Sequence, residues 1–213
     1  MATLGLLHTA TSHRVAFEAL VAESDPSART ITVVDESLLA DARRSGPADA
    51  AVVDALRNHL GELAARGADA IVCTCSTVGG AAESTGAELG LDVVRIDRAM
   101  AAQAVAIGGR VAVLAALEST VTPTRDLIRE IASDRGATVT IRSDVVVGAW
   151  ERFEAGDLSG YHLLVADAIE RVGEVDVIVL AQASMAPAVD RAGAAVPVLS
   201  SPRSAITSVL DRI

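Results

Sequence analysis

Lysine is missing from this chain of 213 residues, because all 18 of its basic residues are arginines. Enzymes that hold pyridoxal phosphate or a substrate as a Schiff base need a lysine amine, and P-loop nucleotidases need a lysine beside the phosphates. Both classes are therefore excluded. The 28 acidic residues give a net charge of −10, and the longest arginine run is the pair Arg43 and Arg44. Binding to a nucleic-acid backbone needs a basic footprint, so no nucleic-acid partner is expected.

Aromatic residues are also scarce, at 2%, although 51% of the chain is hydrophobic. This apolar content is enough for the core of one large domain or two small ones, which excludes disorder as the main state. No apolar run approaches the roughly 18 residues of a membrane-spanning helix, and the N-terminus lacks a signal-peptide pattern. A soluble, cytoplasmic protein with no membrane partner is the expectation.

Only two cysteines are present, Cys73 and Cys75, in the segment IVCTCST. Their spacing is neither that of a CxxC redox motif nor half of a zinc site, because no second ligand cluster accompanies it. The histidines His13, His59 and His162 fall on predicted helices without ligand spacing, so no metal is expected either. We expect both thiols to be reduced, with Cys73 packed in the core.

Two patterns recur in the chain at one spacing. Residues 4–12 (LGLLHTATS) and 111–119 (VAVLAALES) are 107 positions apart, and each combines an apolar strand with a hydroxyl-rich loop. Residues 69–81 and 176–188 are separated by the same interval, and both predict a strand, a polar turn and a helix. Finding one spacing twice indicates an internal duplication.

Strands rich in Val, Ile and Leu alternate with helices, which is typical of parallel sheets covered on both faces. The predicted fold is therefore α/β, with two pseudo-symmetric parallel-sheet halves and the active site in the cleft between them, because ligands bind beyond the carboxyl ends of parallel strands. The first half is predicted to contain residues 1–97 plus 197–213, and the second residues 98–196. The second strand of the first half is predicted over residues 30–34, and that of the second half over residues 138–142.

Polar residues follow the predicted strands at the edge where a ligand would bind. Asp35 and Glu36 either cap the next helix or reach this edge, and capping is favoured. The remaining candidates are His8 and Thr9; Cys75, Ser76 and Thr77; Glu118, Ser119 and Thr120; Ser143 and Asp144; and Gln182, Ala183 and Ser184.

Cys75 ends a strand at the point where the chain turns into a helix. A helix N-terminus stabilises negative charge, and its amide groups can hold a carboxylate. Ser76 or Thr77 can instead cap the helix, which would not prevent binding. We therefore predict Cys75 as a catalytic base or nucleophile. His8 is the candidate for a second acid or base, with a structural, hydrogen-bonded histidine as the alternative.

The segment IVCTCST resembles the first cysteine motif of the aspartate/glutamate racemase superfamily, in which a strand ends in Cys-Asn-Thr. The segments DESLLADA, RID at 95–97 and VLAQASM at 179–185 are similar to its Asp/Glu/hydantoin racemase branch. The resemblance covers nearly the whole chain and implies cofactor-independent chemistry at a carbon beside a carboxylate. It implies a small carboxylate substrate of the amino-acid, hydantoin or dicarboxylate class. Dimers are common in the family, so a homodimer is among the expected partners.

The chain departs from the family's second motif, Cys-Thr-His, where it has Gln182, Ala183 and Ser184. An amide cannot act as a general base, so racemisation by two thiols is in doubt, although Gln182 can donate hydrogen bonds to a substrate oxygen. Cys75 alone permits isomerisation by addition to a double bond, protonation after decarboxylation, or one-base epimerisation. The alternatives are an inactive carboxylate-binding protein and a malonate-type decarboxylase. The residues expected to bind substrate are Thr9, Ser76, Thr77, Ser119, Thr120, Gln182, Ala183 and Ser184.

Overall fold

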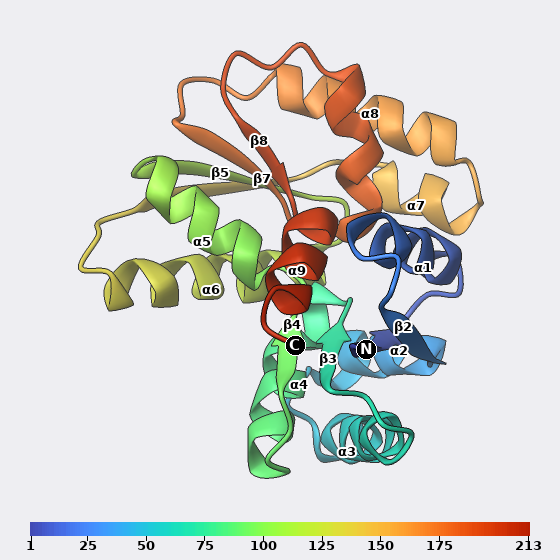
Figure 1. Cartoon of the computed structure of the whole chain (residues 1–213). Coiled ribbons are helices and arrows are strands. Elements are labelled where there is room, and N and C mark those ends of the chain that lie inside the picture. The colour runs from blue at the N-terminus through green and yellow to red at the C-terminus, as the bar shows by residue number, and fades with distance from the viewer. The chain divides into compact units, whose positions relative to one another are not determined.

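The computed structural model describes all 213 residues and divides into two compact α/β units (Figure 1). The first unit contains Met1–Ile96 and Pro202–Ile213, and the second contains Asp97–Ser201. Each unit has one four-stranded parallel sheet, with strand order β2-β1-β3-β4 in the first and β6-β5-β7-β8 in the second. The two orders correspond strand for strand. The predicted α/β class with two parallel-sheet halves is confirmed.

The first unit follows the predicted alternation of strands and helices. Its elements are β1 (Thr3–His8), α1 (His13–Ser24), β2 (Arg29–Val34), α2 (Glu36–Ser45), α3 (Ala50–Ala65), β3 (Ala70–Cys73), α4 (Ser76–Glu88) and β4 (Val93–Arg95), followed much later in the chain by α9 (Ser201–Leu210). All four residues of β3 are buried, as expected for a strand covered on both faces.

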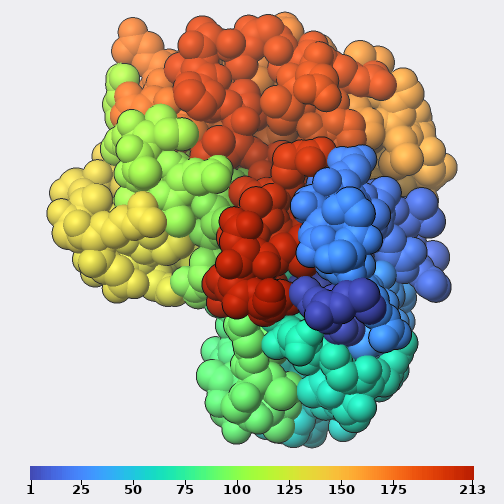
Figure 2. All heavy atoms as spheres, viewed as in Figure 1, coloured from blue at the N-terminus to red at the C-terminus, as the bar shows by residue number.

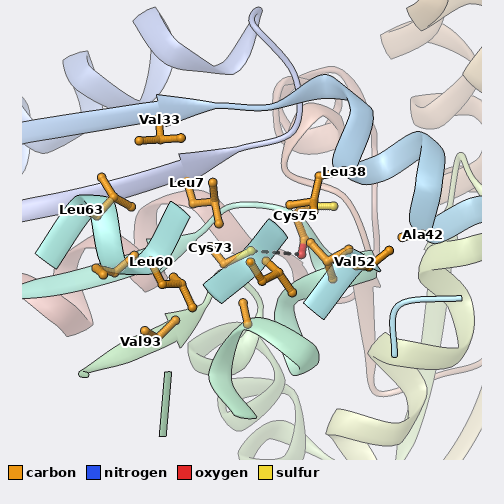
Figure 3. Packing of buried hydrophobic residues seen from close by; sticks show 14 of the residues in the cluster. Leu7, Val33, Leu38, Ala42, Val52, Leu60, Leu63, Cys73, Cys75 and Val93 are labelled. Carbon is orange, nitrogen blue, oxygen red and sulfur yellow. Dashed lines mark hydrogen bonds between the residues drawn. The ribbon is translucent and has the colours of Figure 1, made fainter. Parts of the chain in front are cut away.

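Side chains alternate between the two faces of the first sheet. Leu7 and Cys73 are paired in register and belong to the apolar cluster formed with α2, α3 and α4 (Figure 3). The opposite face meets α1, where Thr32 of β2 donates a hydrogen bond to Glu18. Figure 2 shows α9 beside the N-terminal segment, in agreement with the ion pair between Arg203 and Glu23.

The second unit repeats the arrangement. Its elements are α5 (Arg98–Ile107), β5 (Arg110–Ala115), the short 3₁₀ turn η1 (Glu118–Thr120), α6 (Val121–Asp134), β6 (Thr140–Val145), α7 (Ala149–Glu154), α8 (Leu158–Glu170), β7 (Val177–Leu180), the 3₁₀ segment η2 (Ala183–Arg191) and β8 (Val198–Ser200). One face of its sheet packs on α5 and α6, and the other packs on α7, α8 and η2.

Two elements of the second unit differ from the sequence prediction. β6 begins at Thr140 and continues to Val145, so Ser143 and Asp144 lie inside the strand rather than after it. The prediction was wrong because it copied the bounds of the first half onto a strand whose polar residues alternate with apolar ones. The helix predicted after β7 is a 3₁₀ segment with Pro187 inside it. Proline lacks the N–H that an α-helix needs, which explains the change.

None of the helices combines the length with the apolarity that crossing a bilayer requires.

Candidate functional site

Cys75 is the residue immediately before α4, and its backbone is extended while the helix starts at Ser76. The Cys75 side chain is 8% exposed and makes no capping hydrogen bond. The first amide groups of a helix lack partners within the helix, and they stabilise negative charge close to the helix N-terminus. Cys75 therefore stands beside amide groups that can hold a bound anion such as a carboxylate.

Ser76 and Thr77 form the first turn of α4, and both are buried. Both residues lie inside the helix, and Cys75 is the residue that precedes it. Neither Ser76 nor Thr77 is therefore the N-terminal capping residue of α4. The hydroxyl oxygen of Ser76 is buried and has no hydrogen-bond partner. Buried polar atoms are nearly always paired in native proteins, so this oxygen is available to a ligand.

Arg95 is a buried residue at the site that the sequence did not single out as functional. It ends β4, pairs in register with Cys73, and runs under the first turns of α4. A Cβ atom at Gly79 would be 2.8 Å from the Arg95 Cβ, and one at Gly80 would be 3.3 Å from its Nη1. The two glycines thus let α4 pack directly on an arginine. In the sequence, the glycine pair Gly79 and Gly80 near the start of the predicted helix was the one feature that could have indicated this close packing.

Gly79→Ala is expected to destabilise the protein by about 1–3 kcal/mol, because the added methyl group overpacks against Arg95 Cβ. The matched control is Gly61→Ala in α3, where a Cβ meets nothing within 4 Å. That variant should gain up to about 1 kcal/mol from helix propensity. Urea unfolding of both variants measures the difference, and an equal gain in both would contradict the close approach of α4 to Arg95.

His8 ends β1 and is fully buried. Its Nδ1 lies 2.8 Å from Thr74 Oγ1, which also lies 3.1 Å from the carbonyl oxygen of Leu7. A hydroxyl has one proton and a carbonyl only accepts, so Thr74 donates to Leu7 and accepts from His8 Nδ1–H. His8 Nε2 is then an unprotonated nitrogen, and it has no partner.

The ring of His8 packs on α1, with its centroid 5.3 Å from that of Phe17. Cys75 belongs to the apolar cluster on the other face, with Leu7 and Leu38 (Figure 3). The structure therefore joins His8 to Cys75 only through Thr74, the residue between Cys73 and Cys75. Its acid–base role stays a prediction.

Acid sensitivity should follow from the burial of His8. Burial, together with the charge of His13, lowers the pKa of His8 from 6.5 to about 4. Between these values the unfolded chain binds a proton and the folded chain does not. The contribution to stability is complete above pH 6.5 and is lost as the pH falls toward 4, by roughly 3 kcal/mol.

His8→Asn keeps a side-chain N–H for Thr74 but does not titrate. Its free energy of unfolding in urea should fall less between pH 7.5 and pH 4.5 than that of the wild type. All other titrating groups, including His13, are common to both proteins. If the two profiles run parallel, His8 is not the group responsible.

The loop after β1 is held by the start of α2. Asp35 accepts hydrogen bonds from the backbone and hydroxyl of Ser37, at 2.9 and 2.6 Å, and so caps α2 as favoured from the sequence. Glu36 Oε1 accepts from the backbone N–H of Thr11 at 2.9 Å. This contact fixes the loop that contains Thr9, which is 6% exposed.

Gln182 occupies the matching place in the second unit, between β7 and η2. Its Oε1 accepts hydrogen bonds from the backbone N–H groups of Ala116 and Leu117, at 2.6 and 3.0 Å. These contacts fix the orientation of the amide, since only its oxygen can accept. The Nε2 group remains as a donor for a substrate oxygen. Ala183, the next residue, begins η2 and is 8% exposed.

The other predicted residues of the second unit mainly shape the chain. Ser184 Oγ lies 2.8 Å from the hydroxyl of Tyr161, whose pKa is raised to about 12 by burial. Thr120 Oγ1 donates to the carbonyl of Leu117 at 2.7 Å and closes the turn η1, which also contains Ser119. Glu118 is exposed, as an ordinary loop carboxylate would be.

The predicted residues thus form two groups, one in each unit. The first gathers at the start of α4 and the end of β1, and the second gathers around Gln182 at the ends of β5 and β7. No three His, Cys, Asp or Glu side chains are placed to hold a metal ion.

This fold and these groups define a class: α/β proteins with two parallel four-stranded units, in which a thiol stands at a helix N-terminus. The family model described as Asp/Glu/hydantoin racemase matches residues 8–209. The chain belongs to that family.

Solved structures with the same fold include racemases and a decarboxylase. Picrophilus torridus aspartate racemase has 16% identity and a TM-score of 0.71, covering 99% of this chain and 94% of its own. Bacillus anthracis glutamate racemase has 14% identity and a TM-score of 0.69, covering 99% and 80%. A variant of arylmalonate decarboxylase has 19% identity and a TM-score of 0.60, covering 98% and 92%. At these identities the likeness shows the fold alone. No curated protein matches the sequence.

Proposed function

We propose that this protein is a cofactor-independent, racemase- or isomerase-type enzyme that acts on a small carboxylate, with Cys75 as its only catalytic thiol. The observation that carries the proposal is the start of α4, where Cys75 precedes the helix and the hydroxyl of Ser76 is buried without a partner. Membership of the racemase family supports the reaction class. The substrate class would be an amino acid, a hydantoin or a dicarboxylate.

In this mechanism the Cys75 thiolate removes the proton from the carbon beside the substrate carboxylate. The electron pair moves into the carboxylate, which becomes an enediolate. The proposed donors to its oxygens are Gln182 Nε2 and the hydroxyl of Ser76. Donors fixed before the reaction stabilise developing charge without reorganising.

A single thiol must also return the proton. If the planar intermediate keeps its orientation, the proton returns to the original face, and the result is exchange with solvent without inversion. Inversion requires the intermediate to turn over, or a second acid. For His8 we propose a positioning role through Thr74, because a pKa of about 4 leaves little imidazolium at neutral pH. Thr9, Thr77, Ser119, Thr120, Ala183 and Ser184 would complete the pocket walls.

Decarboxylation of a malonate-type acid is the second candidate. It needs one proton donor after carbon dioxide leaves, and Cys75 supplies one. A variant of arylmalonate decarboxylase is among the solved structures that share this fold, so the reaction is kept as a candidate. An inactive protein that only binds carboxylates is the third candidate.

The experiment is incubation in deuterium oxide with amino acids, hydantoins, maleate and arylmalonates, followed by proton NMR and optical rotation. Loss of the α-hydrogen signal with falling rotation indicates racemisation, and loss without falling rotation indicates one-base exchange. Conversion of maleate indicates isomerisation, and a product one carboxylate shorter indicates decarboxylation. Binding of panel compounds, measured by calorimetry, without any conversion would support the inactive carboxylate-binding protein.

A further inference from the structure

β6 is an open edge of the second unit's sheet, because it pairs only with β5. Thr140 N donates to Gly109 O at 2.6 Å and Val146 N donates to Ala115 O at 2.8 Å. In a parallel ladder alternate residues direct their backbone groups to the partner strand, so the even-numbered residues of β6 face β5. The backbone groups of the odd-numbered residues Ile141, Ser143 and Val145 therefore point outward.

The other edges of the two sheets offer less. β4 and β8 have three residues each. β2 has six, but Arg66 Nη1 lies 3.5 Å from the outward carbonyl of Thr32. β6 thus presents the longest uncovered ladder. Exposed edges of this kind pair readily with another strand, and proteins use charged side chains to restrict that pairing.

The two faces of β6 carry different kinds of side chain. Arg142 and Asp144 share the α8 face, are 46% and 64% exposed, and have their charged atoms 3.9 Å apart. Ile141 and Val145 share the other face and pack partly on the apolar cluster of α5 and α6. The strand therefore has one charged stripe of both signs and one apolar stripe.

We propose that β6 pairs antiparallel with β6 of a second copy of this chain, with Ser143 opposite the partner's Ser143. In this register Arg142 stands opposite the partner's Asp144, and the same pair recurs across the two-fold axis. Ile141 likewise stands opposite the partner's Val145. The three outward-facing residues then exchange backbone hydrogen bonds, while Arg142 and the partner's Asp144 form the non-hydrogen-bonded pair, in which side chains are closest.

Charge complementarity selects this register over its neighbours. Only odd-numbered residues face outward, so the alignment can shift only in steps that keep odd residues opposite odd residues. Shifting the alignment by one such step in one direction places Arg142 opposite the partner's Arg142. Shifting it by one step in the other direction places Asp144 opposite the partner's Asp144. Like charges directly opposite each other are destabilising. The stripe that discourages other pairings therefore favours this one.

A hollow of about 530 Å³ lies along the charged face of the strand. Its walls include Arg142, Asp144 and the α8 side chains Leu164 and Ala168, together with Arg171 just after that helix. It provides room on the α8 side for side chains that an added strand would carry. An isologous contact of this kind gives a closed dimer whose sheet continues through eight strands.

The test is the mass in solution, by light scattering during gel filtration and by sedimentation at protein concentrations up to about 100 μM, in the micromolar range of modest interfaces. The wild type should have twice the 21.8 kDa of one chain. Arg142→Asp and Asp144→Arg should each be monomeric, because each places like charges opposite each other. The double variant Arg142→Asp/Asp144→Arg restores opposite charges and should be dimeric again. Ser143→Pro removes an outward N–H without touching the β5 ladder and should be monomeric.

Cross-linking tests the register. Ser143→Cys should form a covalent dimer on mild oxidation, because directly opposed residues of a hydrogen-bonded pair have Cα atoms about 5.5 Å apart, within disulfide range. Thr140→Cys, on the same strand but not self-opposed, should not. A monomeric wild type overturns the proposal. A dimer that survives both single reversals, or that the folded double variant fails to restore, overturns it too.

Discussion

Cys75→Ala is expected to lose roughly 10²–10⁴-fold in the rate of deuterium exchange into substrate, the usual contribution of one acid–base group. Cys73→Ala is the matched control. The two thiols are two residues apart and both are buried, but Cys73 lies in β3 with its Sγ 3.9 Å from the carbonyl of Cys75 (Figure 3). Cys73→Ala should therefore lose stability and keep its exchange rate.

Alkylation separates the two thiols without mutagenesis. Cys75 should react with iodoacetamide in the native protein and be protected by the substrate, whereas Cys73 should react only after unfolding. Thermal unfolding shows whether each alanine variant is folded at the assay temperature. A folded Cys75→Ala protein that exchanges as fast as the wild type would exclude the thiol as the base.

The alternation of apolar strands and helices was enough to predict the fold, because each strand that is covered on both faces is almost wholly Val, Ile and Leu. It failed at β6, an exposed edge where Arg142 and Asp144 alternate with apolar residues. The position of Cys75 before a helix was predictable because Ser76, Thr77, Gly79 and Gly80 signal a turn into one.

The partners of the site residues could not be predicted from the sequence. No sequence pattern marks Thr74 as a site residue, yet its hydroxyl fixes the tautomer of His8. Arg95 lies in the strand that follows α4, and the packing of α4 on β4 brings it against Gly79. Gln182 was predicted as a donor, but its binding to two backbone amides depends on the ends of β5 and β7 being adjacent. These contacts are long-range, and residue patterns contain no record of them.

Gln182 should prove to have two separable roles, one in the fold and one in binding. Gln182→Leu removes the acceptor of the Ala116 and Leu117 N–H groups and leaves both buried donors unpaired. Each unpaired donor costs about 1–3 kcal/mol, so the loss of unfolding free energy should be among the largest for any single substitution in this unit. Urea unfolding measures it.

Gln182→Glu separates the roles, because a carboxylate still accepts from both N–H groups but has no N–H to donate. We expect this variant to unfold at or near the wild-type urea concentration. Its affinity for aspartate, glutamate and phenylmalonate, measured by titration calorimetry, should fall tenfold or more for whichever of these the wild type binds. The loss of a hydrogen bond to a charged group costs about 1.5–3 kcal/mol, and repulsion between two carboxylates adds to it. Unchanged affinity in a folded Gln182→Glu protein would remove Gln182 from the binding site and leave it a purely structural residue.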